Sequence, residues 1–280
     1  MTYKTILAVV TDRDALQQTI GAASDLARDC DAHLDVLCLG VDRTQGGYYF
    51  AGATAVVLQE TLSRARAEAQ ELAQRVEHML AGTGLAYVVE HGVAQMMDVS
   101  RHVAQRARFA DLCVVAKPYG AGVGVEMEPA VEGALFDGDS PVYIPSGAGQ
   151  GATAHPERVV LAWNDAPEAL RAIRRAMPML TAAKRVHVVV IDPPQHGQTR
   201  SDPGGLLAQY LARHGVKVEI NVLAKTLPRV SDVLKRHATD VGADLIVMGA
   251  YGHSRFREAV LGGATRHMLE HAEIPVVMAH

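Results

Sequence analysis

The sequence predicts an α/β protein built from two tandem, doubly wound domains, each with a parallel sheet of five strands. Three observations lead there. Short runs rich in Val, Ile and Leu alternate with longer amphipathic stretches, the short runs are continuously apolar, and the whole pattern occurs twice. Continuous apolar runs are typical of parallel strands buried on both faces. Their alternation with helices implies right-handed crossovers and open, doubly wound sheets.

The first copy is expected to contain five strands, joined by helices with apolar residues at three- and four-residue spacing. The clearest of these helices is QETLSRARAEAQELAQRVEHML, residues 59–80. The strands are predicted near residues 4–10, 33–39, 85–91, 111–116 and 141–144.

The second copy repeats this order. Its clearest helix is SDVLKRHATDVG, residues 231–242. Its strands are predicted near residues 158–163, 185–191, 216–223, 244–248 and 275–279.

Three internal matches in the same order indicate a duplication. TILAVVTDRDALQQTI (5–20) matches RVVLAWNDAPEALRAI (158–173), ADLCVVAKPYG (110–120) matches ADLIVMGAYG (243–252), and SPVYIP (140–145) matches IPVVMA (274–279). The segment SGAGQGATAHP between the copies is composed of small, flexible residues, as linkers are. We therefore predict domains at 1–146 and 157–280, with a linker at 147–156.

Composition narrows the class of protein. The chain has 280 residues, 49% of them hydrophobic and 21% charged, with a net charge of −4. No basic run with interleaved aromatic residues is present, so we expect no nucleic-acid partner. The start, MTYKTILAVVTDRD, fits neither a signal peptide nor a membrane span. The three cysteines have no CxxC spacing and fit reduced thiols, so we expect a cytoplasmic protein.

The stretch MGAYGHSRFREAVLGGATRHML (248–269) is unusually rich in glycine for a region that also forms a helix. Gly249 and Gly252 follow a predicted strand, and Gly262 and Gly263 precede a predicted helix. Bare main-chain amides in such a loop, together with those at a helix N-terminus, can bind an anion without a cationic side chain. The alternative is that these glycines only shape a tight loop, and spacing alone does not decide between the two.

These residues resemble the motif of the universal stress protein family, in its tandem two-domain form. The family pattern of Gly, two residues, Gly, nine residues, Gly and then Ser or Thr is matched at Gly249, Gly252 and Gly262. Gly263 stands in the Ser/Thr place, with Thr265 two residues later. The resemblance covers essentially the whole chain in two copies. It implies a flavodoxin-like (Rossmann-like) fold and, for members with this motif, binding of ATP.

The resemblance also implies which residues surround the nucleotide, with Mg²⁺ as the expected counterion of ATP. The loop holds ribose and phosphates, while residues after the first and second strands lie on the adenine side. The expected site is Asn164, Ile191, Met248, Gly249, Gly252, His253, Arg255, Gly262, Gly263, Ala264 and Thr265. Asn164 replaces the family's aspartate, and its amide can both donate and accept hydrogen bonds. Asp165, its neighbour, is expected to point elsewhere.

The first copy departs further from the family pattern. Thr11 stands at the aspartate position, Lys117 replaces the first glycine, and EMEPAVE (126–132) puts carboxylates where phosphate would bind. Like charges oppose anion binding. We therefore expect a degenerate first domain without nucleotide.

Other candidate chemistry is weaker. His267 and His271 share a helix face but lack a third ligand, so no metal site is predicted. Trp163 is expected in the core, with stacking on a base as the alternative. There is no GxSxG elbow and no Walker lysine, and we find no activated nucleophile.

The sequence thus predicts an ATP-binding regulatory universal stress protein that is not primarily an enzyme. Two alternatives stay open: a non-nucleotide interaction module or binder of a small apolar ligand, and a slow ATP hydrolase. Residues 141–144 and 275–279 are expected to pair as edge strands in an intrachain pseudo-dimer, and a homodimer is also possible.

Overall fold

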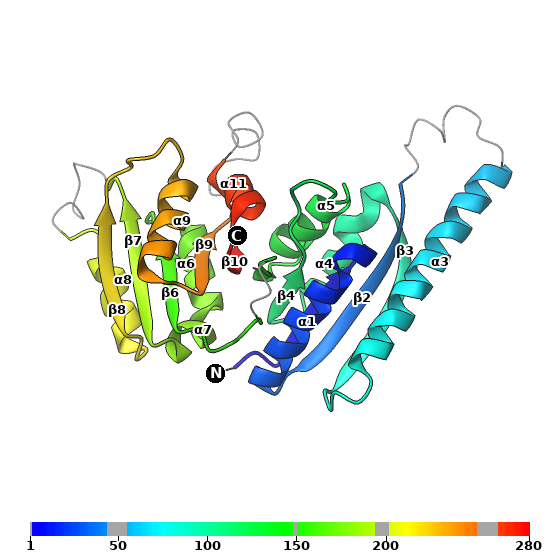
Figure 1. The fold of residues 1–280 in the computed structure, drawn as a ribbon, viewed down its shortest axis with the longest axis horizontal. Helices are drawn as coiled ribbons and strands as arrows, with labels where there is room; N and C mark the ends of the chain where they lie inside the picture. Colours follow the sequence, from blue (N-terminus) through cyan, green and yellow to red (C-terminus); the bar gives the residue numbers. More distant parts are fainter. Residues whose placement is uncertain (1, 44–54, 148–150, 194–201, 251–262) are drawn as a thin grey trace. The chain divides into compact units, whose positions relative to one another are not determined.

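The computed structural model describes residues 2–43, 55–147, 151–193, 202–250 and 263–280. The chain forms two compact units, one of residues Tyr3–Ser140 and one made mainly of Pro141–His280. Each is an α/β layer structure, as Figure 1 shows. The predicted fold class is therefore confirmed, whereas the boundaries at 146 and 157 stay predictions.

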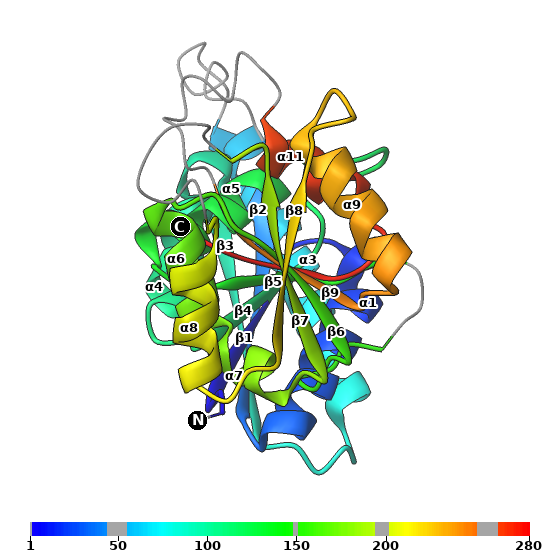
Figure 2. The same cartoon turned by 90° about the vertical axis from the view of Figure 1, so that its left-hand side faces the viewer.

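The first unit contains four parallel strands in the order β3-β2-β1-β4. Helices α1 and α3 cover one face of this sheet, and α4 and α5 cover the other (Figures 1 and 2). Its elements are β1 (Thr5–Val10), α1 (Arg13–Cys30), β2 (His33–Asp42), α3 (Ala55–Leu80), β3 (Tyr87–Gln95), η1 (Met96–Asp98), α4 (Val99–Ala107), β4 (Leu112–Val115), α5 (Met127–Glu132) and the π-helical turn η2 (Gly133–Asp137).

The second unit contains six strands in the order β5-β10-β9-β6-β7-β8. Helices α6, α7 and α8 lie on one face, and α9 and α11 on the other (Figure 2). Its elements are β5 (Val142–Ile144), β6 (Arg158–Ala162), α6 (Pro167–Arg175), α7 (Met177–Ala182), β7 (Arg185–Ile191), α8 (Gly205–Arg213), β8 (Val218–Leu223), α9 (Val230–Val241), β9 (Leu245–Gly249), α11 (Ala264–His271) and β10 (Val276–Ala279).

The expected pairing of 141–144 with 275–279 is present in this second unit. Val142 pairs with Met278, and Ile144 with Val276, in antiparallel orientation. The first compact unit therefore contains four of the described strands and the second contains six, whereas five in each domain were predicted. The pairing satisfies the main-chain groups along one edge of β10, which would otherwise offer a template for another strand.

Local sequence explains where the elements begin and end. Asp12 caps α1, because its carboxylate accepts a hydrogen bond from the Asp14 N–H at 3.2 Å. Pro167 begins α6, where its missing N–H costs nothing. Gly242 ends α9 with a φ of 63°, a left-handed conformation that glycine adopts without strain.

The duplication is visible in equivalent hydrogen bonds. The Asp111 carboxylate accepts from the main-chain N–H groups of Lys4 and Thr5, at 2.7 and 3.0 Å. In the second unit the Asp244 carboxylate accepts from Glu157 and Arg158, at 2.7 and 2.9 Å. The aspartate of each repeated Ala-Asp-Leu sequence thus fixes the start of the neighbouring strand.

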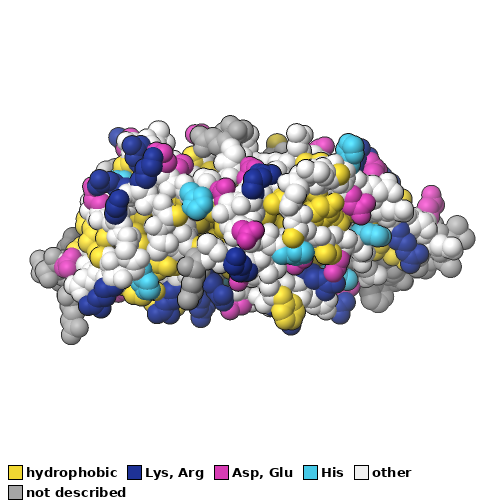
Figure 3. Space-filling view, turned by 90° about the horizontal axis from the view of Figure 1, so that it is seen from below, with side chains coloured by type: hydrophobic (Ala, Val, Ile, Leu, Met, Phe, Trp, Pro, Cys, Tyr) yellow, Lys and Arg dark blue, Asp and Glu magenta, His cyan; other side chains and the backbone are white. Residues whose placement is uncertain are grey.

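Surface charge gives no sign of segregation on the face seen in Figure 3, where acidic and basic side chains lie interspersed. Within the described ranges, no helix is both long and apolar enough to cross a bilayer.

Candidate functional site

A cavity of about 350 Å³ lies at the carboxyl ends of the strands of the second unit. It opens at the carboxyl end of β6, which lies between β9 and β7 in the sheet. The connections that follow β6 and β9 leave toward opposite faces of the sheet (Figure 2). Such a switch point is where doubly wound sheets bind ligands. The cavity is lined by Ala162, Trp163, Asn164, Glu168, Val189, Ile191, Val230, Leu234, Met248, Gly249, Ala264 and Thr265.

Six of the eleven expected site residues line this one cavity, although they come from four separate segments of the sequence. They are Asn164, Ile191, Met248, Gly249, Ala264 and Thr265. Gly263 adjoins them as the N-cap of α11. Gly252, His253, Arg255 and Gly262 lie outside the described residues.

Gly249 is explained by packing of protein against protein. A Cβ atom placed on it would lie 2.6 Å from the main-chain nitrogen of Ala169 and 2.9 Å from the carbonyl carbon of Glu168. Contacts below 3.0 Å essentially never occur for a real Cβ. This glycine therefore lets the end of β9 approach the first turn of α6, whatever a ligand does.

The first turn of α11 forms the opposite wall. Ala264 and Thr265 begin the helix, and Thr265 is 3% exposed. The first N–H groups of a helix have no partner within the helix and carry the positive end of its dipole. This wall can therefore stabilise a negative charge, although Gly263 contributes no side chain.

Asn164 enters the site through a local turn. Its Oδ1 accepts a hydrogen bond from the Ala166 N–H at 3.3 Å, just before α6. With Oδ1 engaged in this way, the two N–H donors of the amide are the groups that Asn164 offers to a ligand. An aspartate here would offer acceptors only.

Trp163 is not in the core, so its expected place was wrong. It is partly exposed and lines the cavity of about 350 Å³. It also lines a second cavity of about 230 Å³. A continuous apolar run predicts burial, but Trp163 follows β6, which ends at Ala162. It therefore lies where the sheet opens to the ligand side.

The second cavity adjoins the first, since Trp163, Asn164 and Ile191 line both. Asp165, expected to point elsewhere, lines this second cavity. Asp165 and Asp192 have φ values of 61° and 44°. Left-handed backbone is unusual outside glycine and is concentrated at functional sites.

Sequence analysis missed Glu168, Val230 and Leu234 in the lining of the larger cavity. Glu168 is 9% exposed and sits in the first turn of α6, where an acidic residue is favoured by the helix dipole. The sequence shows Glu168 directly after Pro167, but an acidic residue in a first helical turn is explained by helix stability alone and does not indicate a binding site. Val230 begins α9 and Leu234 lies one turn later, and their place in the cavity wall depends on how that helix packs.

His267 and His271 stack with ring centroids 4.2 Å apart, and His267 Nδ1 lies 2.8 Å from Ser231 Oγ. Burial lowers the pKa of His267 below its ordinary value, although the Asp232 carboxylate, 3.6 Å from Nδ1, acts in the opposite direction. Neither these residues nor others in the described ranges form a group of three or more possible metal ligands.

The equivalent place in the first unit is filled by side chain. Met127 begins α5 as Ala264 begins α11, and it is 2% exposed. Its sulfur lies 2.9 Å from Thr11 Oγ1, which donates to it. Leu112 pairs with Ile6 in the first unit as Leu245 pairs with Val159 in the second. By this register the residue of the first unit that is equivalent to Gly249 is Ala116, not Lys117.

The predicted carboxylate cluster of the first unit is paired. Glu126, the N-cap of α5, is 0% exposed and receives hydrogen bonds from the Arg43 guanidinium. Arg43 also contacts Glu68 at 3.3 Å. Tyr119 donates to Glu128 at 2.8 Å. These acids form internal contacts at the end of the first unit's sheet.

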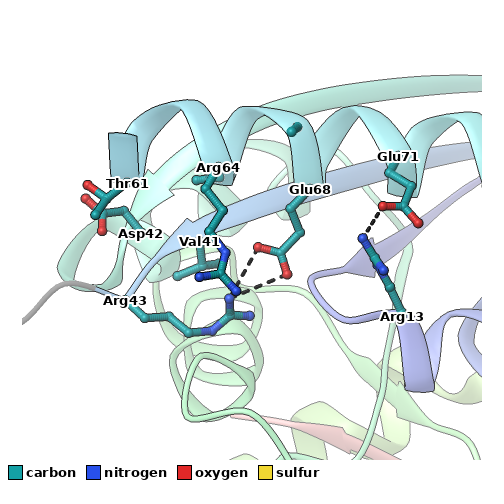
Figure 4. Close-up of a pocket in the computed structure, with 10 residues that line it drawn as sticks. Arg13, Val41, Asp42, Arg43, Thr61, Arg64, Glu68 and Glu71 are labelled. Atoms are coloured by element: carbon teal, nitrogen blue, oxygen red, sulfur yellow. Dashed lines mark hydrogen bonds and ion pairs between the residues drawn. The ribbon is translucent and has the colours of Figure 1, made fainter. Parts of the chain in front are cut away.

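A cavity of about 630 Å³ lies beside Arg43, between β2, α3 and the start of α1 (Figure 4). It is larger than the cavity of the second unit. Two of its arginines, however, face acids: Arg13 pairs with Glu71, and Arg43 with Glu68. Size alone therefore does not make it the better candidate for an anionic ligand.

Comparison with known proteins supports the class that the fold defines, a doubly wound α/β domain. Residues 156–280 match the model of the Universal stress protein family. A universal stress protein from Synechocystis sp. is 32% identical over 103 residues, which are 35% of this chain and 33% of that protein. The chain thus matches about a third of that relative's length.

Two solved structures resemble the fold over nearly the whole chain. A universal stress protein from Archaeoglobus fulgidus has a TM-score of 0.69 at 16% identity, covering 98% of this chain and 95% of that one. A candidate universal stress protein from Pseudomonas aeruginosa has a TM-score of 0.58 at 16% identity, covering 99% and 93%. Residues 156–280 therefore match a universal stress protein domain, and the whole chain shares the fold of these two structures.

Proposed function

We propose that this chain is a regulatory universal stress protein that binds ATP with Mg²⁺ in its second unit, while the first unit binds no nucleotide. The observation that carries the proposal is the cavity of about 350 Å³, which gathers six expected site residues at the switch point of the sheet. Its volume falls within the range of small-molecule sites.

The two walls of this cavity suit the two ends of a nucleotide. The first turn of α11, at Ala264 and Thr265, offers helix N-terminal amides to a phosphate. Ile191, which lines both this cavity and the smaller one beside it, offers apolar surface to a base, and Asn164 offers N–H donors to ring nitrogens.

Glu168 is the acidic side chain that lines this cavity. A single carboxylate beside a phosphate chain is a common arrangement for Mg²⁺, which keeps several waters and takes its other ligands from the phosphates. Without the metal, Glu168 would repel phosphate. We therefore expect ATP to bind more tightly with Mg²⁺ than without it.

Binding of a small apolar molecule is the second candidate, because Val189, Ile191, Val230, Leu234 and Met248 form much of the same lining. Slow ATP hydrolysis stays a weaker alternative, since the described residues give no clear general base for it. A homodimer, a cytoplasmic location and a role in stress response belong to the same proposal.

The test copies the first unit into the second. Ala264→Met places at the start of α11 the side chain that Met127 places at the start of α5. We expect ATP with Mg²⁺ to raise the melting temperature of the wild type and to leave that of Ala264→Met unchanged. Thermal unfolding with and without nucleotide measures both.

Ala212→Met is the matched control, because Ala212 is exposed on α8 and lines neither cavity of this site. It should keep the full shift. An equal shift in wild type and Ala264→Met would contradict the assigned cavity. Mass spectrometry of ligand released from purified protein distinguishes a nucleotide from an apolar occupant.

A further inference from the structure

Trp163 holds an unusual position for its residue type. Its N–H donates to the Val189 carbonyl at 2.9 Å, which extends the β6–β7 pairing by one residue. Its side chain is partly exposed and borders both cavities, of about 350 and 230 Å³. A large indole that is held by the sheet but faces two cavities is positioned for recognition of another flat group.

The first unit offers a direct comparison. Register aligns Val159 with Ile6 and therefore Trp163 with Val10, which is 3% exposed. Valine at that position is buried beside the filled site of the first unit. The tryptophan is therefore associated with the unit whose cavity lies at the switch point of its sheet.

We propose that Trp163 is the stacking surface for the planar ring of the nucleotide and determines that a base-bearing ligand is preferred over phosphate alone. This inference rests on the proposed function. It assigns to Trp163 a role in specificity, through face-to-face contact with a heterocycle.

Charge assigns the two ends of the ligand to the two cavities. Asp165, Asp192 and Asp202 line the smaller cavity, and three carboxylates there would repel a phosphate chain. The same cavity has apolar surface from Val190, Leu207 and the shared Ile191. A neutral ring carrying N–H donors fits both features, since the ring stacks and its donors meet carboxylates.

The phosphate end then belongs to the larger cavity, where the first turn of α11 provides main-chain amides. Trp163 and Asn164 line both cavities. They therefore lie at the junction of ring and sugar. A ligand spanning the two cavities must pass the indole.

The chain contains one tryptophan, so its indole emission reports on this site alone. We would titrate the wild type with ATP and Mg²⁺, with adenosine, and with inorganic triphosphate, following emission and heat in parallel. ATP and adenosine should change Trp163 emission saturably, with the dissociation constants found by calorimetry. Inorganic triphosphate should bind without that change.

Two variants complete the test. Trp163→Leu should weaken ATP and adenosine by about tenfold, in line with the usual contribution of base–aromatic stacking, and leave triphosphate affinity unchanged. Trp163→Phe keeps an aromatic face and should lose no more than about threefold. Circular dichroism would verify that both variants keep the fold of the wild type.

The outcomes separate this inference from the proposed function. If ATP binds by calorimetry but emission is unchanged and Trp163→Leu binds equally well, stacking is wrong and the nucleotide proposal stands. If neither ATP nor adenosine binds the wild type, both are wrong. Equal loss of ATP and triphosphate affinity in Trp163→Leu would mean a structural role and would also overturn the inference.

Discussion

Gly249 carries no side chain at the point where the end of β9 meets the first turn of α6. The hypothetical Cβ contact of 2.6 Å is with main chain, which cannot rotate away as a side chain can. A small residue at this position is therefore a condition for packing α6 against the sheet. Since Glu168 belongs to that turn, the same packing also positions one wall of the cavity.

Gly249→Ala is expected to lower the free energy of unfolding by about 1–3 kcal/mol, the usual cost of overpacking a well-packed interior. Gly21→Ala is the matched control: nothing lies within 4 Å of a Cβ there, and the residue is inside α1. It should stabilise by about 0.5–1 kcal/mol. Urea denaturation measures both, and a neutral Gly249→Ala would contradict the packing explanation.

For individual residues, the sequence indicated which ones lie close together, but it did not give the contacts that bring them there. Asn164, Ile191 and Thr265 line one cavity. For Gly249 the sequence left open whether a phosphate or a tight loop requires glycine, and the packing of α6 is sufficient to require it. Trp163 was expected in the core because its neighbours are apolar. Both outcomes arise because contacts between distant segments are not encoded in local pattern.

At the scale of elements, α5 and α11 show how one helix position decides whether a site is open. Their N-caps are Glu126 and Gly263, and their first residues are Met127 and Ala264. In the first unit Met127 is buried against Thr11, and the Glu126 carboxylate is paired with Arg43. In the second unit the helix start has Gly263 and Ala264 instead, and Ala264 lines an open cavity.

The contact between α9 and α11 should make the second unit sensitive to acid. Burial is the main cause that lowers the pKa of His267; His271, Arg229 and Lys235 act the same way, and Asp232 opposes them. A lowered pKa means that the folded state favours neutral imidazole. The resulting stability is present above the unfolded value of about 6.5 and is lost as the pH falls through the folded pKa.

The free energy of unfolding should therefore fall between pH 7 and pH 5, and His267→Gln should reduce that slope. One proton accounts for at most about 1.4 kcal/mol per pH unit. Some slope should remain, because the pKa of His237 is also lowered by burial. Denaturation at a series of pH values tests this. His155→Gln, at an exposed position, should leave the slope unchanged, and an unchanged slope in His267→Gln would contradict the assignment.

Strands were the most predictable elements. Each of the ten predicted runs overlaps a strand, and the inner strands are continuously apolar because both faces of the sheet are covered there. Ends were less predictable: β2 continues to Asp42 and β3 to Gln95, beyond the apolar runs. The π-helical turn at Gly133–Asp137 has no signal in the apolar spacing, since it depends on packing against α4.

For the whole molecule, the repeated Ala-Asp-Leu hydrogen bonds and the repeated strand order indicate two copies of one fold. The sequence did not predict that β5 belongs to the second compact unit. Residues 141–144 continue the first copy in the chain, but their pairing with β10 makes them part of the second unit. The pairing of 141–144 with 275–279 was itself expected, whereas its effect on the division into compact units was not.

The two units should also differ in what they bind. The cavity of the second unit has a small residue at the start of α11, whereas Arg13 and Arg43 beside the first unit's cavity already face carboxylates. Phosphate would compete there with Glu68, Glu71 and the buried Glu126. A difference between duplicated domains is therefore expected to appear as the number of ligands per chain.

Calorimetric titration of the full chain with ATP and Mg²⁺ measures that number most directly. The account predicts one nucleotide per chain for the wild type and none for Ala264→Met. Two nucleotides per chain would contradict the inactive first unit, and none in the wild type would contradict a nucleotide site in the second.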